Sequence, residues 1–485
     1  MHPPRTLRPL AAALLALVLA ACSGGILRPP VPVAQAPNSA PAAPAAEQAP
    51  SATSAPEPTD PPPTSAPEPT APPPTATPAP PTPAPPTPTP VPIPPTPTLA
   101  PLSADERAAL FDEVWALVRD RYVYRDYRGL DWEEVRAEFV ARVAAAEGEE
   151  EFYALLEELI DRLGDEHSRF DTPQEVAEEA ERFNGTLTYA GIGALVRELP
   201  EGVLITRLAR GGPAELSGLQ PRDLILAVDG VPVSDTVRLG PEGPIGAVRG
   251  APGTTVRLTV SAPDGQVREV AIVRQVIPGD AFPPVEGRRL PGTDIGLVAI
   301  ETFSVAELDG LVRAELERLA AAGPLDGLVL DVRSNGGGRI DLLLATLGLL
   351  VDGGSIGVSE GRRGSRPLEI PPDMTLPQLE GVPVVVLIGE DTVSAAEMFA
   401  AGLQALGRAQ VVGVPSAGNT ENLIGHDLPD GSRLWLAELV FRLPDGTLIE
   451  GRGVQPDRLV EAEWWRFSPE EDPQVLAAVE LLQAH

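Results

Sequence analysis

Between residues 295 and 414 the sequence alternates short apolar runs, rich in β-branched residues, with longer stretches whose apolar residues recur at helical spacing. This alternation predicts a parallel or mixed sheet covered by helices, and it restricts the fold more than any other feature of the chain. We expect strands over 295–300, 327–332, 382–388 and 410–414, and helices over 305–322, 340–350 and 394–406. Strand pairs around 433–442 and 448–454 and a helix over 473–484 complete an α/β core over 281–485.

Two further regions precede this core, so the expected fold class is α+β with several domains. Residues 183–280 have strand-like periodicity, with turn signals at Asp229-Gly230 and Asp264-Gly265. Residues 103–182 predict a small helical domain, because helix-starting residues occur at Ser103, Asp131 and Glu149. The expected strands of the β domain are 185–199, 202–208, 223–230, 254–265 and 267–274, with a short helix over 213–217.

The first hundred residues predict export and tethering. Arg5 and Arg8 precede an apolar run of signal-peptide length, so residues 1–21 are interpreted as a signal peptide. The run ends in L-A-A-C, which resembles a bacterial lipobox and implies a lipid on the sulfur of Cys22; a secreted protein with an accidental cysteine is the alternative. Residues 22–102, rich in Pro, Ala, Thr and Ser, cannot bury a core and predict a disordered tether. The expected location is the extracytoplasmic face of a bacterial membrane, with the lipid as its only membrane contact.

Composition excludes several function classes. A net charge of -32 disfavours binding to phosphate backbones, so no nucleic-acid partner is expected. With one cysteine and no His/Cys cluster, the sequence predicts no metal site and no cofactor. All 37 basic residues are arginine, since the chain contains no lysine. A mechanism that uses a lysine base is therefore excluded.

Two segments suggest acyl-transfer chemistry. Residues 389–419 predict a strand end, a tight turn and a helix that opens on Ser394, where free backbone N–H groups favour negative charge. The alternative is that Ser394 only caps the helix, with Glu397 completing an S-x-x-E capping box. The run L-V-L-D-V-R-S-N-G-G-G over 328–338 puts glycines directly after a strand, as an oxyanion hole or phosphate cradle needs, although a simple turn is equally consistent.

Several motifs in order resemble the carboxy-terminal processing, or tail-specific, serine proteases. They are the N-G-G-G run, T-V-S-A-A-E-M with its helix, and D-G-T-L-I-E-G-R-G-V-Q-P-D, behind a region that resembles a bacterial PDZ domain. The resemblance implies a ClpP/crotonase-like α/β core, Ser394 as nucleophile, and oxyanion donors at Ala395 and at Gly337 or Gly338. It also implies a PDZ loop for the carboxylate of a peptide tail, formed by Gly191, Ile192, Gly193 and Ala194.

The sequence departs from the family pattern at the base. The position of the family's lysine is occupied by Asn419, and that of its supporting carboxylate by Ala405. The segment L-G-D-E-H-S-R-F resembles an element of the tricorn-like and nisin-resistance branch, in which its histidine is the base, which here is His167. A helix C-terminal cation is the alternative role for His167, and His426 is interpreted as a loop residue.

A glutamate orients part of the site in tricorn-like enzymes, and Glu450 in L-I-E-G-R-G-V is the matching candidate, with Asp165 as an alternative. Together these features predict a membrane-anchored extracytoplasmic serine endopeptidase that cleaves unfolded polypeptides, or polypeptides presented by a free or extended C-terminal tail, by a Ser-His mechanism. The PDZ domain would capture the tail and feed or gate the cleft. The alternative is a catalytically inactive PDZ lipoprotein that binds peptides on a protease scaffold.

Overall fold

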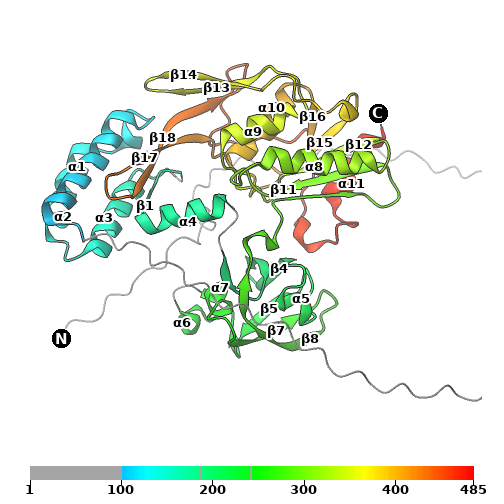
Figure 1. Ribbon diagram of the computed structural model, residues 1–485, viewed down its shortest axis with the longest axis horizontal. Coiled ribbons are helices and arrows are strands. Elements are labelled where there is room, and N and C mark those ends of the chain that lie inside the picture. Colours follow the sequence, from blue (N-terminus) through cyan, green and yellow to red (C-terminus); the bar gives the residue numbers. More distant parts are fainter. Residues whose placement is uncertain (1–100, 166, 185–187, 241–242, 485) are drawn as a thin grey trace, which may run out of the picture. The chain divides into compact units, whose positions relative to one another are not determined.

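The computed structural model describes residues 101–165, 167–184, 188–240 and 243–484 (Figure 1). The predicted signal peptide, the lipobox with Cys22 and nearly all of the proline-rich tether lie outside the described residues. Within the described ranges, no helix has both the length and the apolar character needed to cross a membrane.

The amino-terminal region is helical, and its three predicted helix starts are confirmed. Ser103 caps the first helix and forms a capping box with Glu106, and Asp131 caps the second through the amides of Glu133 and Glu134. The third helix leads through a turn to a short strand, and His167 lies in that connection. The elements are α1 (Ala104–Arg121), α2 (Trp132–Ala145), α3 (Glu149–Asp161), β1 (Arg169–Asp171) and α4 (Pro173–Phe183).

These helices do not form a core of their own. Phe139, Phe152 and Leu156 are fully buried in one cluster with Leu434 and Leu436 from the carboxy-terminal strand β18 (Arg433–Arg442). Burial of such a side chain contributes about 1.5–3 kcal/mol. Strand β1 also pairs antiparallel with β18, with Arg169 opposite Trp435. The helical region is therefore joined to the far end of the chain by both packing and backbone hydrogen bonds.

The second region is the predicted β domain, built on a sheet of order β3-β4-β5-β7-β8. The expected single strand over 185–199 is wrong, because the chain turns at Ile192 and Gly193, where Gly193 has φ +74°. This turn separates β2 from β3 and leaves β3 at the sheet edge. The elements are β2 (Tyr189–Gly191), β3 (Ala194–Leu199), β4 (Gly202–Leu208), α5 (Pro213–Leu216), β5 (Leu224–Val228), β6 (Val231–Pro232), α6 (Thr236–Leu239), α7 (Gly243–Val248), β7 (Thr255–Ser261), β8 (Val267–Val273) and β9 (Gln275–Ile277).

The α/β core confirms the alternation predicted from the sequence. Its sheet has the order β10-β11-β12-β15-β16-β19, parallel except for the β10–β11 pair. Alternate residues of β15 enter different clusters: Val384 and Val386 pack with α8, α9 and α10, whereas Val385 and Leu387 pack with α11. Helices thus cover both faces (Figure 1). The elements are β10 (Val285–Arg289), β11 (Ile295–Ile300), α8 (Leu308–Ala321), β12 (Gly327–Asp331), α9 (Ile340–Gly348), β15 (Val384–Ile388), α10 (Ala395–Ala405), β16 (Ala409–Gly413), β19 (Arg458–Leu459) and α11 (Pro473–Gln483).

A second sheet lies beside this core. In it β18 pairs with β17 (Glu421–Asp427), with β1, and with β13 (Ser355–Gly361) of the β13–β14 hairpin, whose second strand is β14 (Gly364–Glu369). The expected strand over 448–454 is wrong: only an isolated bridge joins Arg442 and Leu448. Gly451 and Gly453 there have φ of +70° and +68°, which turn the chain back toward the loop that contains Gly418.

Candidate active site

Ser394 lies at a sharp turn between the fully buried strand β15 and helix α10. Its φ of +56° and ψ of -119° are unfavourable for a residue with a Cβ and cost about 1–3 kcal/mol. Strand, strained turn and helix in this order are the geometry by which hydrolases expose a nucleophilic serine. The turn is held by the Ser394 amide, which donates to the Asn419 carbonyl and to Glu397 Oε2, both at 3.0 Å.

Glu397 does more than complete a capping box. This fully buried carboxylate also accepts hydrogen bonds from Ser416 Oγ (2.6 Å), the Gly418 amide (2.6 Å) and the Asn419 amide (2.9 Å). The loop that carries lysine in the family resemblance is therefore fixed here to the first turn of the serine helix. Asn419 takes part through its backbone, which supports the position of Ser394.

The glycine run lies directly against Ser394. A Cβ on Gly337 would be 2.7 Å from Ser394 Cβ and 2.9 Å from the Val393 carbonyl oxygen, so only glycine fits there. The Gly337 amide donates to Asn335 Oδ1 at 2.9 Å and is already used. The amides of Gly338 and Ala395 have no hydrogen-bond acceptor among the residues that the structure describes. Of the two glycines considered from the sequence, Gly338 has the free donor.

His167 is held between α3 and β1 by its neighbours. Asp165 Oδ1 accepts hydrogen bonds from the amides of His167 (3.1 Å) and Ser168 (2.6 Å), and Ser168 Oγ accepts one from the Ala437 amide (3.0 Å). Asp165 thus orders the backbone of this segment rather than the imidazole. The ring contacts a residue that the sequence did not single out: Nδ1 of His167 lies 3.2 Å from Oε2 of Glu421.

Glu421 begins strand β17, and only 1% of its side chain is exposed. Its other carboxylate oxygen accepts a hydrogen bond from the Tyr124 hydroxyl at 3.0 Å. Burial opposes ionisation of this carboxyl, but contact with His167 outweighs that effect, helped by Glu450 and Tyr124, and the pKa of Glu421 is lowered. The same negative charge adds to burial in raising the pKa of Tyr124, which keeps this phenol a donor.

Glu450, the predicted orienting carboxylate, is a neighbour of Glu421. Its Oε2 accepts hydrogen bonds from the amide (2.5 Å) and hydroxyl (3.0 Å) of Thr420, and no contact with His167 is recorded in the described part of the chain. Burial raises the pKa of Glu450 to about 7, and the neighbouring Glu421 contributes to the rise. Near neutral pH the two carboxyls therefore share a site in which Glu421 is the more readily ionised.

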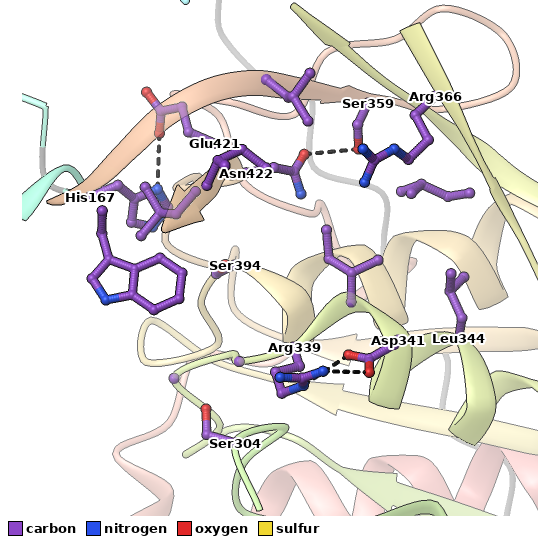
Figure 2. A pocket seen from close by; sticks show the side chains of 18 of the residues that line it. His167, Ser304, Arg339, Asp341, Leu344, Ser359, Arg366, Ser394, Glu421 and Asn422 are labelled. Carbon is purple, nitrogen blue, oxygen red and sulfur yellow. Dashed lines mark hydrogen bonds and ion pairs between the residues drawn. The ribbon is translucent and has the colours of Figure 1, made fainter. Parts of the chain in front are cut away.

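One cavity of about 670 Å³ brings the two principal candidates together. Ser394, His167, Glu421 and Gly338 line it, and Figure 2 shows His167 above Ser394, with a dashed line from its ring up to the carboxylate of Glu421. Its other lining residues come mainly from α9, the β13–β14 hairpin and strands β17 and β18. His426, expected in a loop, instead lies on β17, where its Nε2 is 2.6 Å from Glu438 Oε1.

A second cavity, of about 270 Å³, lies in the β domain. The loop residues singled out from the sequence all line it: Gly191, Ile192, Gly193 and Ala194. Ile245 and Val248 of α7 line it as well, next to the edge strand β3. An extended peptide can add to such an edge while its last side chain enters an apolar cavity. No group of His, Cys, Asp and Glu side chains able to hold a metal ion occurs in the described part of the chain.

Models of three protein families match the chain, and they cover its three regions. Residues 103–161 match the tricorn protease C1 domain, residues 204–261 match a PDZ domain, and residues 294–460 match peptidase family S41. The solved structure of a photosystem II D1 C-terminal processing protease has the same fold, with a TM-score of 0.52 and 24% identity over 74% of this chain and 94% of that one.

Two relatives are described as carboxyl-terminal-processing proteases. The one from Picosynechococcus sp. is 30% identical over 386 residues, which cover 78% of this chain and 89% of the relative. The one from Synechocystis sp. is 28% identical, over 79% of this chain and 88% of the relative. The chain therefore belongs to the carboxyl-terminal-processing proteases of peptidase family S41, and it is a serine-type peptidase with a PDZ domain.

Proposed function

We propose that this chain is a lipid-anchored, extracytoplasmic serine endopeptidase that cleaves unfolded polypeptides or polypeptides presented by their C-terminal tails. The observation that carries the proposal is the shared cavity, in which Ser394 and His167 both present side chains and Glu421 lies against the imidazole. An imidazole titrates near neutral pH and is suited to the proton transfer that lysine performs in other family members.

In this mechanism the protonated Nδ1 of His167 donates a hydrogen bond to Oε2 of Glu421, 3.2 Å away, which leaves Nε2 free to take the proton of Ser394 Oγ. The Ser394 oxygen attacks the peptide carbonyl, and the free amides of Ala395 and Gly338 stabilise the oxyanion. The imidazolium then protonates the leaving amine, and water attacks the acyl-enzyme with His167 again as base. Tyr124 holds the second oxygen of Glu421 and so fixes the carboxylate against the ring.

The mechanism is tested by measuring the cleavage of a disordered polypeptide by Ser394→Ala and His167→Ala. We expect kcat to fall by about 10⁴-fold or more in each, because nucleophile and base act as a unit. Asn419→Ala should lose far less, since Asn419 supports Ser394 through its backbone. Wild-type rates in Ser394→Ala or in His167→Ala would refute this mechanism.

A peptide-binding protein without catalysis is the second candidate, and the absence of lysine at position 419 is the observation in its favour. Membership of a peptidase family and the free amides beside Ser394 favour the enzyme. A fluorophosphonate probe separates the two, because it should label Ser394 in the wild type and leave Ser394→Ala unlabelled. An unlabelled wild-type protein would favour the binding protein.

The preference for tails rests on the PDZ cavity and on the names of the two cyanobacterial relatives. We expect a peptide with an apolar last residue and a free carboxylate to bind more tightly than its amidated form. Membrane attachment rests on Cys22, the only cysteine in the chain. Cys22→Ser should release the protein from the membrane fraction when it is expressed in a bacterium, and continued attachment would contradict a thioether-linked lipid anchor.

A further inference from the structure

We propose that Arg366 selects substrates that carry a carboxylate close to the scissile bond. The inference rests on the proposed function, because it assigns a specificity to the same cavity. It concerns the end of the cavity that the catalytic groups do not use: in Figure 2, His167 and Ser394 lie on one side of the cavity, and Arg366 and Leu344 lie on the other.

Strand pairing directs Arg366 into the cavity. In the β13–β14 hairpin Arg366 lies opposite Ser359, so both side chains are on the same face of the sheet. Ser359 is 1% exposed, and its hydroxyl donates to Asn422 Oδ1 at 3.0 Å. Leu368, two residues after Arg366, is on the same face and also lines the cavity. Arg366 therefore lines the cavity on the face of the hairpin that carries Ser359, although the residue is exposed at the cavity's outer edge (Figure 2).

The charge of Arg366 is uncompensated, unlike that of the other arginines that line the cavity. Arg169 pairs with Asp171 at 3.0 Å and Glu179 at 3.1 Å, and Arg339 pairs with Asp341 at 2.7 Å. Glu421, at the catalytic end, is engaged by His167 and Tyr124. For Arg366, no hydrogen bond or ion pair with any described residue is recorded. Among the three arginines that line this cavity, Arg366 is thus the one whose guanidinium has no carboxylate partner in the described part of the chain.

The chemistry of the guanidinium and of the cavity indicates which group of a substrate would pair with Arg366. A guanidinium binds a carboxylate through two parallel hydrogen bonds, a geometry that an ammonium cannot provide. The cavity has both polar and apolar lining residues, and Leu344 lies on the same side as Arg366 (Figure 2), which suits a carboxylate on a short hydrocarbon stem. The apolar lining residues of the cavity include Ile340, Leu344, Leu368 and Leu439. The carboxylate can belong to a Glu or Asp side chain near the cleaved bond or to the free end of a short tail.

The test compares kcat/KM for matched quenched-fluorescence peptides. One pair differs by Glu against Gln at each position flanking the bond, and the other by a free against an amidated C-terminus. We expect the wild type to prefer the carboxylate peptide about 10-fold or more, as for a hydrogen bond to a charged group. In Arg366→Gln the ratio should approach one, and in Arg366→Glu a peptide with Arg at that position should become the better substrate.

Arg363→Gln is the matched control, because Arg363 is an exposed arginine of the same hairpin that does not line the cavity. It should keep the wild-type preference. Since the PDZ cavity is unchanged in both variants, a free-terminus effect that disappears only in Arg366→Gln belongs to the active-site cavity, and the Glu/Gln pair identifies a side-chain carboxylate. A wild type without preference, or an Arg366→Gln variant that keeps it, would overturn the inference.

The role of Arg366 can be tested even if the proposed catalytic mechanism is wrong. If Ser394→Ala cleaves as fast as the wild type, the catalytic proposal fails. The preference is then measured as binding of the same peptides to Ser394→Ala by fluorescence anisotropy. Equal affinity for the Glu and Gln peptides and for the free and amidated termini, with and without Arg366→Gln, would refute the role of Arg366 independently of turnover.

Discussion

Two polar contacts of Glu421, with His167 and with Tyr124, hold its two carboxylate oxygens. One carboxylate oxygen contacts the imidazole of His167, and the other receives the hydroxyl of Tyr124. In the proposed mechanism, a carboxylate in this position would fix the tautomer of the ring and stabilise the imidazolium that forms when Ser394 is deprotonated. The two contacts should therefore differ in importance, since the first acts on charge and the second on position.

Replacement of Glu421 by Gln should lower kcat/KM by about 10²- to 10⁴-fold, because the amide keeps the shape but loses the charge that stabilises the imidazolium. Tyr124→Phe removes one hydrogen bond, worth about 0.5–1.5 kcal/mol, and should cost about 10-fold or less. Steady-state rates of both variants on one peptide measure the two losses, and circular dichroism confirms that both variants fold. Equal losses in the two variants would mean that Glu421 only fills space.

Glu450 makes stability depend on pH in a defined direction. Its pKa in the folded protein is about 7, above the ordinary value of 4.5, so the folded state binds a proton that the unfolded state has lost between these values. Its contribution to stability is complete below about pH 4.5 and is lost as pH rises through about 7. Glu450→Gln removes this titration, so its stability relative to the wild type should be higher at pH 8 than at pH 5. Urea unfolding midpoints measure the difference, and a constant difference would contradict the shift.

The sequence points to Ser394 and His167 as candidates because each occurs in a motif with a defined local geometry, and the structure places both at one cavity. Glu421 carries no such signal: it is one of 69 acidic residues and follows S-A-G-N-T without periodicity. Its position depends on the pairing of β17 with β18 and on the approach of Tyr124 from the helical region. Only the tertiary structure brings it to the ring, although its place two residues after Asn419 was a clue that could have been followed.

At the scale of elements, the strained turn of Ser394 depends on the loop packed against it. Gly337 has φ +95°, and a Cβ built on it would lie 2.7 Å from Ser394 Cβ and 3.1 Å from the Ala395 nitrogen, whereas a Cβ on Gly336 would have no atom within 4 Å. In the glycine run, Gly336 has room for a side chain, whereas a side chain at Gly337 or Gly338 would collide with neighbouring backbone.

Gly337→Ala should displace Ser394 and lower kcat by about 100-fold or more, because its Cβ would clash with backbone that cannot move independently. Gly336→Ala, with no atom within 4 Å of the added methyl, should keep most of the activity and a wild-type thermal midpoint. Rates and midpoints of the two variants are compared directly. Comparable activity in both would show that the turn tolerates the shift.

The elements that the sequence predicted best are those buried on both faces. Strands such as β12 and β15 are continuous apolar runs, and the intervening helices have regular spacing, so local pattern and burial agree. The β13–β14 hairpin was missed because β14 is mostly exposed and polar. The strand expected over 448–454 failed because apolar residues there alternate with glycines of positive φ, which turn the chain instead of extending it.

At the scale of the whole molecule, the PDZ domain contacts the nucleophile loop through Arg197. This residue of the edge strand β3 forms an ion pair with Asp391, three residues before Ser394, and its guanidinium lies 4.2 Å from the centre of the Trp465 ring. Leu195 and Val196 of the same strand line the peptide cavity. One short strand thus carries both residues of the peptide cavity and the residue that pairs with the nucleophile loop.

Arg197→Ala should leave the affinity of the PDZ cavity for tails unchanged. It should also reduce the advantage in cleavage rate of substrates with an apolar tail over substrates without one, because the ion pair with the nucleophile loop is lost. Arg210→Ala, an exposed change on the same domain, should keep the wild-type ratio. Peptide binding and cleavage are measured on the same preparations. An unchanged ratio in Arg197→Ala would show that this contact does not transmit binding.

The pairing of β1 with β18 determines when, during synthesis, the segment that bears His167 becomes anchored. Chains leave the ribosome amino-terminus first, and domains fold as their residues become available. The segment that bears His167 is anchored by a strand made some 260 residues later, through the Ala437 amide and the Arg169–Trp435 pairing. If His167 is the base, as proposed, a nascent chain that has exposed both the histidine and the serine still lacks the strand that anchors the histidine, so its active site would form only when synthesis is nearly complete.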